Sequence, residues 1–310
     1  MVRLEQMTAA AALEGAEGLP WRQVAWNGVR FDTPADWEIG RIGQRHLLLE
    51  TTAGPVLEVK WGPIKGKFSL RNQLKQLAAS QGRRLRGSLS VEKLPAHWGR
   101  VLARYESLGF AWRSGPLSGR GVLLYCPVCR QAILLQFFET SVRPPFTQAD
   151  RVLASFDDHD QRPVTLWSVF DIRAQVPAAY RLKKFRFDAG CYDLFFTNRH
   201  SRLSLLRWSP AAVLLANGGL VGFEKRSLGW SANRNVRLKA RSALIMELEE
   251  GPPGRLSSRW YRRLQRHPLY RSGRLWHEVE KNRILGVRLE DRKPIDAGVL
   301  EEICDTYMTV

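Results

Sequence analysis

Three stretches from the first half of the chain return in the second half, in the same order. In the first pair, apolar and polar residues alternate before Pro-Ala-x-aromatic. The second pair is a strand-like run that ends in a basic residue and Trp. The third pair has apolar residues that match without a gap. The matched stretches are Trp26–Trp37 with Trp167–Tyr180, Val56–Trp61 with Leu203–Trp208, and Ile133–Phe156 with Ile284–Tyr307. Because self-similarity at a long period is typical of duplicated units, we predict two divergent copies, with Trp61 equivalent to Trp208 and Ile133 to Ile284.

The length of 310 residues suits two domains of ordinary size. Within each copy, alternating stretches precede a helical pattern, further strands and a last helix. This order predicts the α+β class, with two tandem repeats that are each an antiparallel sheet with helices packed against it. We expect an N-terminal extension at 1–19, the first repeat at 20–158, a linker at 159–166 and the second repeat at 167–310.

Individual elements follow from periodicity and capping residues. We expect one strand over 23–32 and a helix after Ser69 with an apolar stripe that includes Leu70 and Leu74. The aromatic residues that end the Pro-Ala-x-aromatic stretches, Trp37 and Tyr180, follow a strand and a turn. Both are therefore expected to be buried at the base of their sheets.

Two of these stretches carry a family resemblance: Phe31-Asp-Thr-Pro34-Ala-Asp-Trp37 and, more distantly, Val176-Pro177-Ala-Ala-Tyr180. Together with the order of strands and helices, they resemble the PsbP/Mog1 family. That family includes photosystem II extrinsic subunits and a Ran-binding nuclear import factor, so the resemblance implies a scaffold that docks to other macromolecules. No residue matches a partner-binding motif of either branch, and no site is transferred.

The chain is strongly basic, with a formal net charge of +18. Such a charge attracts nucleic acid or an anionic lipid surface, although an arginine-rich composition also arises from GC-rich coding sequence. Arg255 to Arg274 contains no acidic residue, and as a helix it has an apolar stripe with the arginines off it. A solvated helix face is the alternative interpretation of this segment. The predicted nucleic-acid-binding residues are Arg255, Arg259, Arg262, Arg263, Arg266, Arg271 and Arg274.

The run Lys183-Lys184-Phe185-Arg186 is a smaller basic feature. We expect it to be an exposed loop or the edge of a sheet.

Cys126-Pro-Val-Cys129 has the spacing at which two thiolates hold one zinc ion. The gap-free repeat match places His277 at Cys126 and Glu280 at Cys129, so these four residues are the predicted metal ligands. Arg130 stands where zinc knuckles usually have Gly, which favours the alternative that the thiols are small apolar residues of a hairpin turn and that no cofactor is bound. Asp157 to Asp160 is expected to be solvated linker.

No Walker loop, nucleophile elbow, zinc-protease or dinucleotide-binding motif occurs in the chain. Its apolar stretches are far shorter than the roughly 20 residues that a membrane helix needs, and its start lacks the pattern of a signal peptide. We therefore expect a non-enzymatic, cytoplasmic protein that binds an acidic macromolecule, with nucleic acid favoured over acidic protein. The alternative is a protein stabilised by metal at Cys126 and Cys129, with an unrecognised catalytic role.

Overall fold

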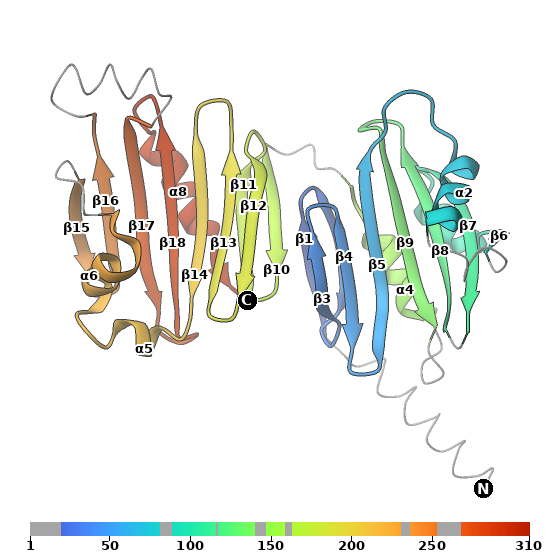
Figure 1. Ribbon diagram of the computed structural model, residues 1–310, viewed down its shortest axis with the longest axis horizontal. Coiled ribbons are helices and arrows are strands. Elements are labelled where there is room, and N and C mark those ends of the chain that lie inside the picture. Colours follow the sequence, from blue (N-terminus) through green and yellow to red (C-terminus); the bar gives the residue numbers. More distant parts are fainter. Residues whose placement is uncertain are drawn as a thin grey trace, which may run out of the picture. The chain divides into compact units, whose positions relative to one another are not determined.

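The chain folds into two compact units, one extending to Gln161 and including Ser168–Phe170, the other made of Arg162–Trp167 and Asp171–Val310. Figure 1 shows that most of each unit is a large sheet. The computed structural model describes residues 20–80, 89–115, 117–139, 147–158, 163–230, 236–252 and 268–310.

The sheet of the first unit is antiparallel and has seven strands. Two runs of consecutive strands meet in it, because β5 pairs with β9 at its centre. In spatial order the strands are β3 (Glu38–Gly43), β4 (His46–Thr51), β5 (Gly54–Pro63), β9 (Gln131–Glu139), β8 (Leu117–Cys126), β7 (Glu106–Ser114) and β6 (Ser90–Glu92).

Both faces of this sheet are covered in part. On one face, Leu74 of α2 (Leu70–Ser80) packs in a cluster with Phe110, Leu123 and Leu134. On the other face, the ring of Phe137 lies 6.1 Å from that of Trp98 in α3. This second face also meets the hairpin of β1 and β2, since Trp61 Nε1 donates a hydrogen bond to the Asn27 carbonyl. The bounds are α3 (Ala96–Val101), β1 (Trp21–Trp26), β2 (Val29–Pro34) and α4 (Thr147–Ser155).

The second unit has its own seven-stranded antiparallel sheet. In spatial order its strands are β12 (Arg181–Asp188), β13 (Cys191–Thr197), β14 (Arg202–Trp208), β18 (Arg283–Asp291), β17 (Tyr270–Glu278), β16 (Ile245–Glu250) and β15 (Val236–Ser242). The other elements are β10 (Val164–Val169), which begins inside the predicted linker, β11 (Ile172–Pro177), α5 (Ala211–Leu215), α6 (Gly219–Phe223), the π-helical turn η1 (Glu224–Leu228), α8 (Ala297–Thr306) and β19 (Met308–Thr309).

The two sheets have the same strand order, with β12 in the place of β3 and β15 in the place of β6. Smaller features repeat as well. The pairing at the β3 edge shifts between Ile39 and Arg41, and the pairing at the β12 edge shifts between Leu182 and Lys184. The shared order is the relation that the predicted duplication requires.

The predicted residue match between the copies is wrong by one position. Trp61 pairs with Ile133, and Trp208 pairs with Ile284, so each couple does occupy neighbouring strands. However, Ile133 lies on the face opposite to α2, because its neighbour Leu134 packs with Leu74. Trp208 and Ile284 instead pack against α6. A slip of one residue moves every side chain to the other face of a strand.

The predicted α+β class is wrong as well, because the described residues are mostly strand, in large antiparallel sheets. The reason is one of dimensions. Seven strands about 4.8 Å apart make a sheet about 29 Å wide, whereas α2, with 11 residues, is about 16 Å long. The short helices therefore cover only part of each sheet. The sheets dominate the fold.

The burial predicted for Trp37 is confirmed, since its relative exposure is 3%. Tyr180 is only partly buried. No helix among the described residues is long and apolar enough to cross a membrane.

Candidate functional site

The turn between β8 and β9 presents two cysteines. Cys126 ends β8 and pairs with Gln131, which begins β9, so the four residues between them form a tight turn. The turn closes with a hydrogen bond of 2.9 Å from the Arg130 N–H to the Cys126 carbonyl. Arg130 has a φ of 56°, the left-handed conformation that favours glycine. The backbone at this position thus has a conformation typical of glycine, although the residue is arginine.

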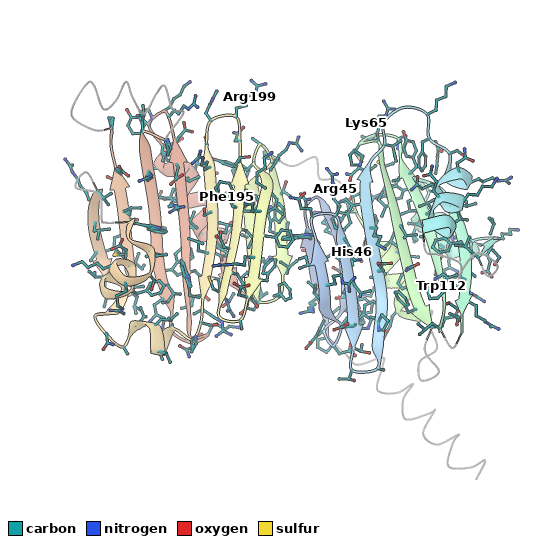
Figure 2. The ribbon with its side chains drawn as sticks, in the orientation of Figure 1. Arg45, His46, Lys65, Trp112, Phe195 and Arg199 are labelled. Carbon is teal, nitrogen blue, oxygen red and sulfur yellow. The ribbon has the colours of Figure 1, made fainter. Side chains whose placement is uncertain are left out.

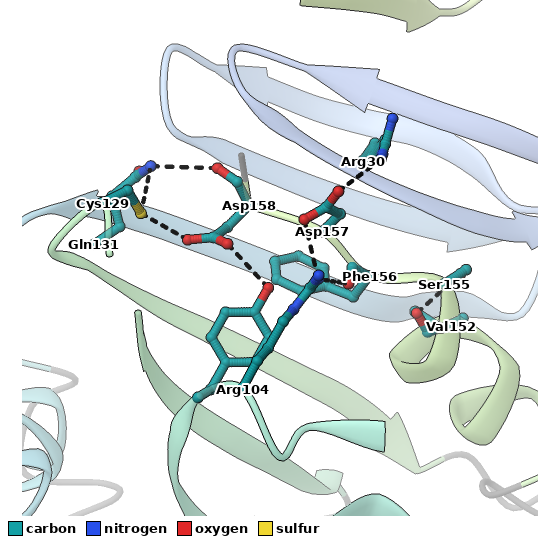
Figure 3. Close-up of polar contacts among 10 residues, drawn as sticks. Arg30, Arg104, Cys129, Gln131, Val152, Ser155, Phe156, Asp157 and Asp158 are labelled. Atoms are coloured by element: carbon teal, nitrogen blue, oxygen red, sulfur yellow. Dashed lines mark hydrogen bonds and ion pairs between the residues drawn. The ribbon is translucent and has the colours of Figure 1, made fainter. Parts of the chain in front are cut away.

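Asp158 lies beside the two thiols and is buried, with a relative exposure of 1%. The Cys129 thiol donates a hydrogen bond of 2.8 Å to Asp158 Oδ2, and the Tyr105 hydroxyl donates one of 3.0 Å to Oδ1. The Sγ atoms of Cys126 and Cys129 and a carboxylate oxygen of Asp158 all lie within 4.8 Å of one another. Figure 3 shows the contacts of Asp158 with Cys129 and Gln131.

The cluster makes the Cys129 thiol less acidic. Burial and the hydrogen bond to Asp158 raise the pKa of Cys129 to about 12. Since the thiolate is the nucleophilic form of cysteine, Cys129 is a protonated donor at neutral pH. The arrangement does not fit a reactive cysteine.

Asp157 fixes the chain that carries Asp158. Its carboxylate forms ion pairs with Arg30 at 2.7 Å and with Arg104 at 3.0 Å. Its backbone exchanges two hydrogen bonds of 2.8 Å with Arg30. The prediction that this acidic run is solvated linker is therefore wrong for Asp157 and Asp158. His159 and Asp160 lie outside the described residues.

The other two predicted metal ligands, His277 and Glu280, belong to a different unit from the two cysteines. They lie in the second unit, where His277 belongs to β17 and Glu280 to the following turn. By position in the hairpin, Cys126 corresponds to Glu278, because Cys126 pairs with Gln131 and Glu278 with Arg283 across turns of equal length. The sequence match, which placed His277 at Cys126, is therefore one residue out of register with the hairpins. Asp158 and Tyr105 were missed because they are distant in sequence from the cysteines.

The predicted basic helix is also corrected where the structure describes it. Arg271 and Arg274 lie in strand β17 and point to opposite faces, since they are three positions apart. Arg271 pairs with the buried Glu250 at 2.8 Å, and Arg274 pairs with Glu247 at 2.9 Å. These two arginines neutralise internal carboxylates. The other predicted residues, Arg255, Arg259, Arg262, Arg263 and Arg266, lie outside the described residues.

A different group of cations gathers on the second sheet. Directly paired residues of antiparallel strands point to the same face, and one such row runs Lys184, Phe195, Ser204, Arg288 across β12, β13, β14 and β18. Phe195 is partly exposed within this row. Figure 2 shows it on the sheet. We call the following residues the basic face: Arg181, Lys184, Arg186, Phe195, Arg202 and Arg288.

Three carboxylates, Glu290, Asp193 and Asp188, share this surface. Glu290 accepts ion pairs from Arg271 at 3.1 Å and lies 3.7 Å from both Arg202 and Arg288. Burial raises the pKa of Asp193, an effect that Arg186 and Arg288 oppose. Asp188 lies 3.2 Å from Arg186 on the same strand. Five cations against three carboxylates leave the surface positive.

The matching row of the first sheet has a different chemistry. By strand order and register it runs Arg41, Leu48, Glu58, Gln136. Glu58 there forms ion pairs with His46 at 2.8 Å and with Lys60 at 2.7 Å. An aromatic residue and an added arginine thus distinguish the second unit from the first.

No family model and no curated protein matches the chain. A solved structure from Bacteroides thetaiotaomicron VPI-5482 is similar to part of it, with 14% sequence identity and a TM-score of 0.28. The match covers 46% of this chain and 50% of that one, so the chain spans about half the length of that structure. Similarity at this level does not establish a shared fold or function, and the PsbP/Mog1 resemblance stays a prediction from sequence.

Proposed function

We propose that this protein binds single-stranded nucleic acid on the basic face of its second unit. The observation that supports this function is the row in which partly exposed Phe195 lies between Lys184 and Arg288 on the sheet. Proteins that bind single strands combine cations along the phosphate backbone with aromatic side chains on which bases stack.

The surroundings of Phe195 fit this occupant. Helices α5 and α6 cover the end of this face near Leu206 and Trp208, whereas Phe195 and Arg202 belong to its other end. Beyond that end, the β13–β14 turn carries Arg199, which is exposed (Figure 2). A strand of unpaired bases can place a base on Phe195 and its phosphates near these cations. A duplex keeps its bases stacked inside and cannot use the aromatic ring.

The test compares two pairs of exposed cations at opposite edges of the same sheet. The test variant is Lys184→Gln with Arg186→Gln on β12, and the control is Arg237→Gln with Lys239→Gln on β15. We expect the test variant to bind a labelled single-stranded oligonucleotide about tenfold more weakly and to lower the slope of log K against log salt by about 1.4, since each lost phosphate contact removes about 0.7. Fluorescence anisotropy over a salt series measures both quantities.

Phe195→Ala separates base stacking from charge. Stacking on an aromatic side chain contributes about 1–3 kcal/mol per base, so this variant is expected to weaken binding at least fivefold with the salt slope unchanged. Equal losses in the two charge variants, with no effect of Phe195→Ala, would mean that total charge alone attracts the polymer. An affinity for polyglutamate equal to that for the single-stranded oligonucleotide would point to an acidic protein partner instead.

A further inference from the structure

We propose that Cys126, Cys129 and Asp158 form a zinc site within the first unit, with the fourth coordination position open to water or an external ligand. All three side chains belong to the same unit, and they come from the β8–β9 turn and from the chain that leaves α4. The site is independent of the nucleic-acid function proposed for the second unit.

The separations fit a tetrahedral ion. With Zn–S bonds of about 2.3 Å and Zn–O bonds of about 2.0–2.2 Å, neighbouring ligand atoms of a zinc site lie about 3.5–3.8 Å apart. The ligand atoms of Cys126, Cys129 and Asp158 lie within 4.8 Å of one another. Small side-chain rotations therefore suffice to close the three ligands around one ion. Two thiolates and a carboxylate carry three negative charges, and a divalent cation reduces this total to one.

A surrounding shell already orients these groups. Tyr105 donates to Asp158 Oδ1, which leaves the other carboxylate oxygen directed at Cys129. Gln131 Nε2 lies 3.6 Å from Cys129 Sγ and 3.5 Å from the Asp158 carbonyl. Ligands held by such outer hydrogen bonds are typical of metal centres.

In the second unit, the corresponding turn and the chain after the last helix are joined by a hydrogen bond instead of by thiols. There Glu278 occupies the position of Cys126, and the Thr309 hydroxyl, after α8, donates a hydrogen bond to the Glu278 carboxylate. The turn and the chain after the last helix thus meet in both units. Only the first unit has sulfur ligands at this junction, so the donor set rather than the fold points to zinc.

Zinc content of the intact, reduced protein tests the site. After addition of zinc and removal of the excess, we expect one tightly bound ion per chain, and we expect none in Cys126→Ser with Cys129→Ser or in Asp158→Ala. The control variant Cys191→Ser with Cys304→Ser removes the two other thiols, both in the second unit, and should keep the ion. Cobalt(II) in place of zinc should give thiolate charge-transfer absorption that the first variant lacks.

Tyr105→Phe supplies a finer test because it removes a hydrogen bond and no ligand. We expect it to retain zinc with an affinity 10–100-fold lower, the usual effect of losing an outer-shell partner. A wild-type protein that binds no zinc when fully reduced, or a double serine variant that still binds it with unchanged cobalt absorption, would overturn the proposal. Circular dichroism of each variant verifies that the sheet has formed.

Discussion

Trp37→Ala is expected to lower the free energy of unfolding of the first unit by about 3–5 kcal/mol, the usual cost of emptying a large aromatic site. Trp37 is 3% exposed, and its backbone carbonyl accepts a hydrogen bond from Arg22. The side chain is therefore part of the core of the first unit. Urea denaturation followed by circular dichroism measures the loss.

Tyr180→Ala serves as the control, since Tyr180 ends the matching Pro-Ala-x-aromatic stretch but is only partly buried. We expect a smaller loss than for Trp37, because less apolar surface leaves the core. A loss below about 1 kcal/mol for Trp37→Ala would be inconsistent with a core position.

The second large effect is expected from Asp171→Ala, which removes the carboxylate partner of a buried arginine. Arg207 is 4% exposed and pairs with Asp171. Its guanidinium also lies 4.5 Å from the centre of the Tyr192 ring. Removal of one member of a buried pair costs about 3–5 kcal/mol because the other charge stays buried. The Asp171 side chain is 26% exposed, so solvent screening places the expected loss of stability near the lower limit, about 3 kcal/mol.

Asp188→Ala is the matched control, because Asp188 and its partner Arg186 are each 60% exposed. Its expected cost is below about 1 kcal/mol. In the background of Arg207→Met, Asp171→Ala should cost less than in the wild type, since only the partly exposed Arg283, 3.1 Å from Asp171, then loses its partner. Additive losses in this double-mutant cycle would show that the pair is not coupled.

The sequence predicted several local elements correctly, but it did not predict that strands would dominate over helices. Residues 23–32 were expected as one strand, whereas Asn27 and Gly28, with φ of 45° and 95°, form the turn between β1 and β2. Asn-Gly is a strong hairpin signal, so this error was avoidable. The width of the sheets could not be predicted from the sequence. Pairing of β5 with β9 joins segments about 75 residues apart, and no local pattern encodes it.

Prediction of the candidate sites was limited in the same way, because they depend on contacts between residues distant in sequence. Cys126 and Cys129 were recognisable from spacing alone, but Asp158 reaches them only because α4 returns the chain to the β8–β9 turn. Lys184 and Arg186 were expected at a sheet edge or in a loop, and they do lie on an edge strand. Phe195 carried no signal, because its place beside Lys184 depends on the register of β12 with β13.

The most direct test of the proposed function is ultraviolet cross-linking of single-stranded RNA to the intact protein, followed by tryptic digestion and mass spectrometry. Cleavage after Arg186 and Arg199 releases residues 187–199, a peptide that contains Phe195. The account predicts that this peptide carries the main cross-linked nucleotide and that Phe195→Ala removes it. Cross-links confined to peptides of the first unit, with none on residues 187–199, would contradict it.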